Sequence, residues 1–202
     1  MSTSRDPKTL VETSYRLLDR TTNPFHRHII QTYIRRLVLE VTGRAEEFLE
    51  FAVEDAHFMA TLIVPACIET KGVQETKATL SKLKEHFRCF VEDSVVMVSD
   101  DGLFHSYYFH HLIPGSVMIE LNKLEDQDGN KIEAGTTYER VGKYNHFIRF
   151  NSEGRIVQES NGQCGPDKLI KCSEDSQPTL EEVKNRLNPI LESLPKWTPY
   201  SG

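Results

Sequence analysis

The spacing of apolar residues changes near residue 88 of this chain, and that change limits the possible fold more than any single motif does. Within residues 23–41 apolar side chains recur every three or four positions, as on one face of an α-helix. They are Phe25, Ile29, Ile30, Tyr33, Ile34, Leu37, Val38 and Val41. From residue 88 onward apolar and polar residues alternate instead, with turn sequences SDDG, DQDG and NSEG between the alternating segments. Helices followed by an antiparallel meander predict an α+β fold.

Local signals set the expected boundaries of the elements. A proline follows an N-capping residue at 6–7 and again at 23–24, and Thr179 and Glu182 form a capping box. The predicted helices span about 6–19, 23–41, 45–52 and 71–87, with a last one from 179 onward. The predicted strands span about 56–64, 88–98, 103–113, 116–125, 131–150 and 155–160.

The composition is typical of a globular domain and excludes several classes of protein. The 202 residues suffice for one domain with a core, and 24 basic against 30 acidic residues give a net charge of −6. No basic stripe is present, so we expect no nucleic-acid partner. The start MSTSRDPKTL has no apolar signal-peptide core, and no apolar run approaches ~18 residues. We therefore expect a cytoplasmic protein without a membrane span.

Neither the cysteines nor any motif indicates a metal or a cofactor. The four cysteines contain no CxxC pair, and we expect them to be reduced thiols. The sequence has no GxSxG, no HExxH, no Gly-rich phosphate loop and no dinucleotide fingerprint. We predict a protein that uses neither metal nor cofactor.

The stretch LFHSYYFHHL contains three histidines and two tyrosines. Because strand side chains alternate between faces, His105, Tyr107, Phe109 and His111 share one face and His110 lies on the other. His105 and His111 are six residues apart, about 20 Å at ~3.3 Å per residue, whereas histidine ligands lie ~2.0–2.1 Å from a zinc ion. This strand alone cannot hold a metal, which leaves a single histidine acting with groups from neighbouring elements.

Three features of the chain are typical of one superfamily: the order of the predicted elements, Gly72 in KGVQETKATL, and the closing segment GKYNHFIRFNSEGRIVQES. In these features the chain resembles the NTF2-like (SnoaL-like) superfamily. Its members are cone-shaped α+β barrels, in which a curved antiparallel sheet packs on helices and leaves a pocket between the layers. The resemblance implies one domain over residues 1–202 with a core at about 24–162. Residues 1–23 would add an N-terminal helix, and residues 163–202 a tail with a helix.

The tripeptide EHF contains His86, His111 follows 25 residues later, and Asn145 stands on the long strand before the SEG turn. This spacing resembles the fungal scytalone dehydratases, where two histidines and an asparagine line the pocket. The resemblance implies His86 and His111 as catalytic residues and Asn145 as a substrate-binding residue. The chain departs from that family in two places: Glu40-Val41 replaces a Tyr-Asp pair, and Ala60 stands near the position of a pocket tyrosine.

Carried onto both long strands, the same resemblance places the pocket on their odd-numbered faces. Tyr107 and Phe109 on one strand, and Phe147 and Arg149 on the other, would then bind substrate, Tyr107 as a donor and Arg149 as partner of an anionic group. The opposite face of the later strand, around His146, would be a subunit interface or be covered by the added helices. We expect a homodimer.

Such a pocket suits proton transfer next to a carbonyl, which needs a base and a donor for the developing enolate oxygen. An imidazole suits the base because its unperturbed pKa is ~6.5. In ketosteroid-isomerase-like members an acidic base lies near the first strand, which adds Asp55 and His57 as substrate-binding candidates.

We expect a cofactor-independent dehydratase, isomerase or cyclase that acts on a small apolar carbonyl compound, a polyketide or terpenoid intermediate of secondary metabolism. A non-catalytic protein that binds a ligand or serves in an assembly is the alternative, so enzymatic activity itself stays open. An epoxide hydrolase is a further alternative, which would require two carboxylates facing inward.

Overall fold

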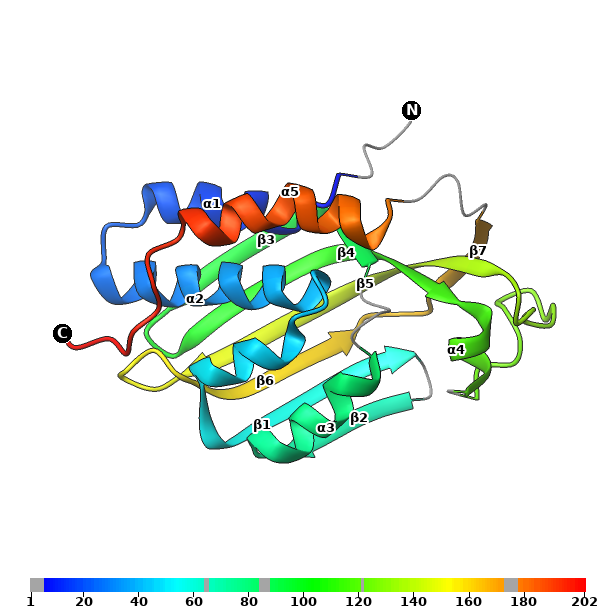
Figure 1. Ribbon diagram of the computed structural model, residues 1–202, viewed down its shortest axis with the longest axis horizontal. Helices are drawn as coiled ribbons and strands as arrows, with labels where there is room; N and C mark the ends of the chain where they lie inside the picture. The colour runs from blue at the N-terminus through cyan, green and yellow to red at the C-terminus, as the bar shows by residue number, and fades with distance from the viewer. Residues whose placement is uncertain (1–5, 64–65, 84–87, 121, 173–177) are drawn as a thin grey trace.

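The chain forms one curved sheet with helices on its concave side (Figure 1). The computed structural model describes residues 6–63, 66–83, 88–120, 122–172 and 178–202. None of the helices in these ranges is long and apolar enough to cross a membrane. The elements are, in chain order, α1 (Thr9–Arg20), α2 (Pro24–Val41), η1 (Ala45–Phe51), β1 (Ala52–Ile63), β2 (Ala66–Lys71), α3 (Val73–Leu83), β3 (Arg88–Ser99), β4 (Gly102–Pro114), α4 (Gly115–Glu120), β5 (Thr137–Phe150), β6 (Ile156–Gln163), β7 (Lys168–Cys172) and α5 (Leu180–Ser193).

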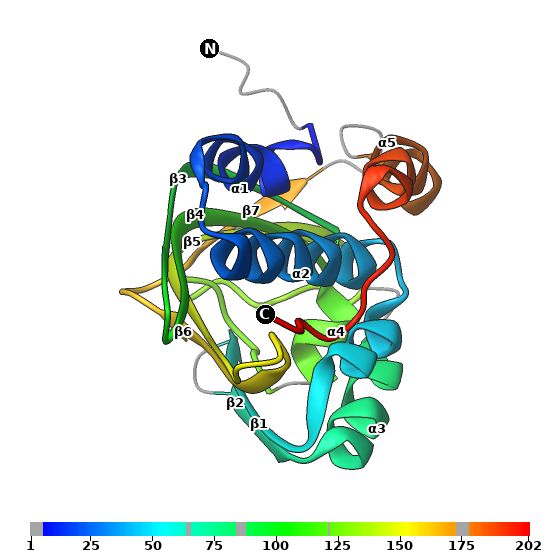
Figure 2. The same ribbon diagram turned by 90° about the vertical axis from the view of Figure 1, so that its left-hand side faces the viewer.

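The sheet is open and mixed. Its strands follow the order β2-β1-β6-β5-β4-β3, and β7 pairs with the first part of β5. The β1–β6 pair is parallel, whereas the other neighbours are antiparallel. Figure 2 shows the sheet bending around α2, with β3 and β4 beside this helix and β1 and β2 below it. The concave face of the sheet thus surrounds one side of this helix.

Helix α2 lies at the centre of the core because an apolar stripe runs along it. Asn23 caps the helix by accepting the His26 N–H at 3.1 Å, and Pro24 occupies the first helical position. The apolar side chains of this helix without exposed surface are Ile29, Ile30, Tyr33, Ile34 and Val38. The apolar stripe expected from the sequence is therefore the buried face, and α1 and α5 pack against the same helix.

Three segments differ from the expected elements. The predicted strand over 116–125 is wrong, because Gly115–Glu120 form α4 and bury Met118 against a small cluster around Tyr138. A short run of consecutive apolar residues fits a buried helix as well as a strand, so periodicity cannot separate them. Strands β2 and β7 were not expected; β7 forms at the edge of β5 and buries Leu169.

Gly102 lies where a side chain would collide with the neighbouring strand, since a Cβ atom there would lie 2.2 Å from the carbonyl oxygen of Ile148. Gly102→Ala should therefore lower the free energy of unfolding by about 1–3 kcal/mol, the usual cost of overpacking. Urea denaturation measures this change. Gly162→Ala is the matched control, because a Cβ atom at Gly162 meets nothing within 4 Å and should change stability by less than about 0.5 kcal/mol. Equal losses in both variants would contradict the prediction.

Candidate functional site

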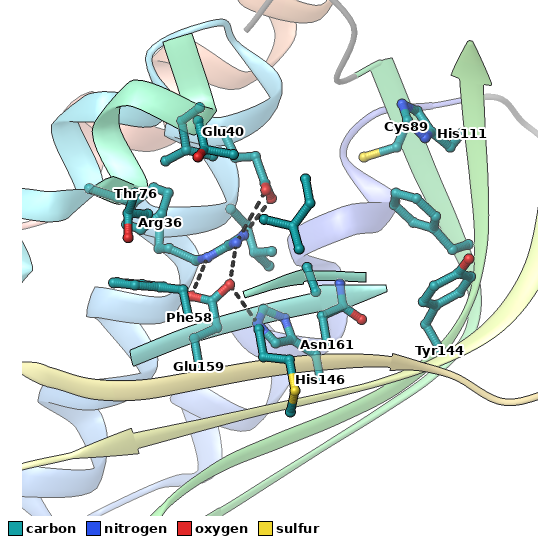
Figure 3. Close-up of a pocket in the computed structure, with 18 of the residues that line it drawn as sticks. Arg36, Glu40, Phe58, Thr76, Cys89, His111, Tyr144, His146, Glu159 and Asn161 are labelled. Carbon is teal, nitrogen blue, oxygen red and sulfur yellow. Dashed lines mark hydrogen bonds and ion pairs between the residues drawn. The ribbon is translucent and has the colours of Figure 1, made fainter. Parts of the chain in front are cut away.

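A cavity of about 100 Å³ lies between α2, η1 and α3 on one side and the concave face of the sheet on the other (Figure 3). A single buried water needs only roughly 10–15 Å³, so the cavity has room for a small organic molecule. Its apolar walls include Leu37, Phe48, Phe58, Ile68, Leu80 and Phe109. Polar side chains gather at separate places along these walls.

The first polar group is a guanidinium between two carboxylates, here called the Arg36 cluster (Arg36, Glu40 and Glu159). Arg36 Nε donates to Glu159 Oε2 at 3.0 Å, and Nη2 donates to the other oxygen of Glu159. Arg36 also donates to both oxygens of Glu40, one turn further along α2. The side chains of Arg36 and Glu159 are 5% and 7% exposed, whereas that of Glu40 is 18% exposed. Glu40 is therefore the more accessible carboxylate.

The charges of the Arg36 cluster stabilise each other. Burial alone would raise the pKa of Glu159, but the charge of Arg36, aided by His146, outweighs burial and lowers this pKa to about 2. Burial would likewise lower the pKa of Arg36, and its two carboxylate partners raise it well above the usual value. Glu159 and Arg36 are thus both held in their charged forms.

A chain of buried rings continues from Glu159 into the core. His146 Nε2 lies 3.1 Å from Glu159 Oε1, and His146 Nδ1 lies 3.2 Å from the hydroxyl of Tyr33. The same hydroxyl lies 2.6 Å from Nδ1 of His105. Burial, with His146 nearby, lowers the pKa of His105 to about 3, so the His105 ring is neutral. The two ring nitrogens of His146 lie beside Glu159 and Tyr33, which suits this ring to holding Glu159 rather than to acting as a base.

The second polar group lies further along β4 and β5. His111 pairs with Arg140 across β4–β5 and with Cys89 across β3–β4, and all three line the cavity. Arg140 donates to the hydroxyl of Tyr144 and forms an ion pair with Asp167 at 3.1 Å. Tyr144 donates its own proton to Asp167 at 3.0 Å. Burial raises the pKa of Cys89 and of Tyr144, so both keep their protons at neutral pH.

Tyr107 and Asn161 form a third polar feature beside the Arg36 cluster. Asn161 Nδ2 donates to the hydroxyl oxygen of Tyr107 at 3.3 Å. Burial and the charge of Glu40 raise the pKa of Tyr107, so this hydroxyl also keeps its proton. Because Asn161 is the donor in their hydrogen bond, the Tyr107 proton is available to a ligand.

Solved structures share this architecture, although no family model and no curated protein matches the sequence. A candidate SnoaL-like polyketide cyclase from Shewanella putrefaciens is 9% identical, with a TM-score of 0.52 over 74% of this chain and 86% of that one. An NTF2-like protein from Anabaena variabilis is 12% identical, with a TM-score of 0.51 over 73% of this chain and 96% of that one. A candidate SnoaL-like polyketide cyclase from Jannaschia is also 12% identical, with a TM-score of 0.50 over 71% and 90%.

This chain has the NTF2-like (SnoaL-like) fold. The fold expected from the order of the elements is therefore confirmed, whereas the expected bounds of its core, about 24–162, stay a prediction. At these identities the likeness extends to the architecture and not to any particular activity.

Within the NTF2-like fold, the alternation expected for β4 places Tyr107, Phe109 and His111 in the cavity lining. His105 shares their face but lies deeper, in the ring chain beneath the cavity. His110 lies on the other side of the strand, 2.8 Å from Glu139. The three imidazoles of this stretch thus occupy three different environments, as alternation and distance along a strand require.

The face of β5 that we expected to line the cavity, its odd-numbered residues, is wrong, because the even-numbered residues face the cavity. In the register between β4 and β5, each odd-numbered residue of β4 lies opposite an even-numbered residue of β5. Asn145, Phe147 and Arg149 consequently lie on the convex side, where Phe147 is 38% exposed. His146 and Tyr144 line the cavity instead. Helices do cover the face of His146, but that face is the cavity side and not a subunit interface.

The remaining candidates lie elsewhere. His57 lies at the β1–β2 edge, 2.9 Å from Glu69, and Asp55 is exposed, so neither lines the cavity. His86 falls outside the described residues, and its catalytic role stays a prediction. Within the described ranges, no group of three or more His, Cys, Asp or Glu side chains is arranged to hold a metal ion.

The Arg36 cluster was not predicted from the sequence, and local patterns explain why. Arg36 and Glu40 have the i,i+4 spacing that ordinary surface ion pairs also have. Glu159 is a single acidic residue in RIVQES, and nothing beside it indicates burial. The one useful signal was Glu40, the acidic residue nearest to the Tyr-Asp position of the scytalone dehydratases.

Glu159 makes the fold sensitive to acid. Its pKa is about 2 in the folded chain against 4.5 for a free side chain, so its stabilising charge is fully present above about pH 4.5. This contribution is lost as the pH falls from that value toward 2. Glu159→Gln should remove this part of the pH dependence and lower stability at neutral pH by about 3–5 kcal/mol, because Arg36 loses a buried partner.

Urea denaturation at a series of pH values measures both effects of Glu159→Gln. The matched control is Glu153→Gln, since Glu153 pairs with Arg155 at the surface and its side chain is 56% exposed. The control should keep the wild-type pH profile. A Glu159→Gln protein with the wild-type slope in acid would show that Glu159 is not held ionised.

Proposed function

We propose that this protein catalyses cofactor-independent proton transfer on a small, largely apolar carbonyl compound, as a dehydratase, isomerase or cyclase. The observation that carries the proposal is that His111 lies directly opposite Arg140 inside a cavity with apolar walls. Residues directly opposed in an antiparallel pair have Cβ atoms about 4.5–5.5 Å apart. Both side chains can therefore act on one small molecule.

In the proposed reaction, His111 takes a proton from the carbon next to the carbonyl group, and the electron pair moves onto the carbonyl oxygen. The guanidinium of Arg140 stabilises the negative charge that develops there. Returning the proton to another carbon completes an isomerisation, and giving it to a departing hydroxyl completes a dehydration. In a cyclisation, the carbanion instead forms a bond to a second carbonyl carbon, the electron pair of that carbonyl moves onto its oxygen, and the resulting alkoxide takes the proton back from His111.

The surroundings of Arg140 support this role because they hold the guanidinium in one place. Asp167 and Tyr144 bind it, and its central carbon lies 5.1 Å from the centre of the Tyr144 ring and 5.9 Å from that of Phe109. A charge that is already oriented costs little reorganisation when the transition state forms. The apolar walls also exclude water, which strengthens the electrostatic interaction.

One further observation bears on the class of substrate, and another bears on whether the protein is an enzyme or a carrier. Structural neighbours carry the name polyketide cyclase, which supports a polyketide intermediate over a terpenoid one. A non-catalytic carrier needs only apolar walls, whereas this cavity contains polar pairs such as Tyr107 and Asn161 at 3.3 Å. Catalysis is therefore the better explanation of the cavity. The homodimer and the cytoplasmic location stay predictions.

Exchange of carbon-bound protons tests the role of His111. With 4-phenyl-2-butanone in deuterated water, the wild-type protein should speed up deuterium incorporation next to the carbonyl, as followed by NMR. His111→Gln should lower this rate by about 100-fold or more, the usual contribution of a general base. His110→Gln is the matched control, because this neighbouring imidazole lies on the other side of β4. Near-full activity in folded His111→Gln protein would refute the assignment.

Epoxide hydrolysis is a second candidate that the Arg36 cluster favours. The requirement of two inward carboxylates is met, since Glu40 and Glu159 both line the cavity. Glu159 is fixed as the ionised partner of Arg36, which leaves Glu40 as the base. Glu40 would take a proton from water while the water oxygen bonds to an epoxide carbon and the ring C–O bond breaks. Tyr107 would protonate the alkoxide to give a diol and regain its proton from Glu40.

The substitutions Glu40→Gln and His111→Gln distinguish the two candidate reactions. If the protein is an epoxide hydrolase, styrene oxide in ¹⁸O-labelled water should give a diol with one labelled oxygen, detectable by mass spectrometry. Glu40→Gln should abolish diol formation and His111→Gln should leave it unchanged. Absence of labelled diol above the uncatalysed background would exclude this candidate.

A further inference from the structure

The part of the cavity around Glu40 and Asn161 has hydrogen-bonding groups that the protein does not use. Asn161 Oδ1 is buried and has no partner in the part of the chain that the structure describes. Each Glu40 oxygen accepts from Arg36, and a carboxylate oxygen has room for a second donor. Tyr107 adds a hydroxyl proton, because Asn161 is the donor in the bond between them. A ligand here meets acceptors and a donor together.

These groups are held on rigid elements. Glu40 is in the last turn of α2 and is bound by Arg36. Asn161 is in β6, where it pairs with His146 of β5 and with Ala60 of β1. In Figure 3 Glu40 and Asn161 project toward the same space from opposite sides. Their positions are therefore set before a ligand binds, which favours selective binding.

The chemistry of this space distinguishes between ligand groups. A carbonyl or an ether only accepts, so it would leave the buried Asn161 Oδ1 without a donor and would give Glu40 no hydrogen bond beyond those from Arg36, which disfavours its binding. An ammonium only donates, so it cannot accept the hydroxyl proton of Tyr107. A hydroxyl group donates to Glu40 or Asn161 and accepts from Tyr107. It alone of these groups matches the donors and the acceptors together.

We propose that Glu40 and Asn161 form a subsite for a hydroxyl group, and that the substrate is a carbonyl compound with this hydroxyl at its far end. The inference rests on the proposed function, which places the carbonyl at His111. His111 lies four residues beyond Tyr107 on β4, about 13 Å at ~3.3 Å per residue. The two functional groups therefore belong to opposite ends of one molecule with an apolar middle.

Three probes that differ only at the far end test the subsite: 4-(4-hydroxyphenyl)-2-butanone, its methoxy analogue and the parent 4-phenyl-2-butanone. Dissociation constants come from titration calorimetry. The hydroxyl probe should bind about tenfold more tightly than either of the others, which corresponds to about 1.4 kcal/mol. Equal affinity of the hydroxyl and methoxy probes would overturn the inference, since only the first can donate. Binding of none of the three would also overturn it.

Two substitutions test which residues cause the preference for the hydroxyl probe. Asn161→Leu keeps the size of the side chain and removes the free acceptor, so the preference should fall below about threefold while the parent compound binds as before. Glu40→Gln keeps an acceptor for Arg36 and should also reduce the preference, because an amide replaces an acceptor oxygen with a donor. Asn145→Leu is the matched control on the convex face and should keep the full preference. An unchanged preference in both folded Asn161→Leu and Glu40→Gln proteins would overturn the inference.

Deuterium exchange separates this inference from the proposed function. If the wild-type protein catalyses exchange of the parent ketone but binds all three probes equally, the subsite is wrong and the proton-transfer function stands. If the hydroxyl probe is preferred but no ketone exchanges, the subsite stands and the function is wrong.

Discussion

Arg36 places a full positive charge inside the core, and the need to pair this charge positions the elements around it. Glu40 comes from the same helix, but Glu159 comes from β6, 123 residues further along the chain. A buried charge without a partner costs several kcal/mol. Helix α2 therefore packs on the sheet in the position that brings Glu159 to the guanidinium. All three residues line the cavity, so this pairing also determines where its walls lie.

The same arrangement is used twice in the cavity. At one end Arg36 is neutralised by Glu159, and at the other Arg140 is paired with Asp167. Each guanidinium thus keeps its orientation in a place where water does not screen it. Between them the walls are apolar, which suits a molecule with polar groups at its ends. Both proposed chemistries use a fixed cation beside a proton-accepting side chain, His111 in one case and Glu40 in the other.

Prediction from the sequence succeeded where the signal was local. The apolar stripe of α2 is the buried face, and alternation along β4 correctly placed His111 and Tyr107 on one side. It failed where two distant segments had to be aligned: Asn145 was assigned to the cavity, but the register of β5 turns it to the convex side. The helix α4 was also missed, because a short apolar run does not reveal its period.

The order of most elements, and with it the resemblance to the NTF2-like superfamily, can be read from the sequence alone. The same is true of the side chains that share a face in α2 and in β4. Helical and strand faces repeat every 3.6 or two residues, so each short segment contains them. The contact of Glu159 with Arg36 and the position of Arg140 opposite His111 follow only from the folded structure. Such contacts depend on the register between strands and on the curvature of the sheet. A shift of one residue reverses every side chain of a strand, and no local pattern in this chain sets that register.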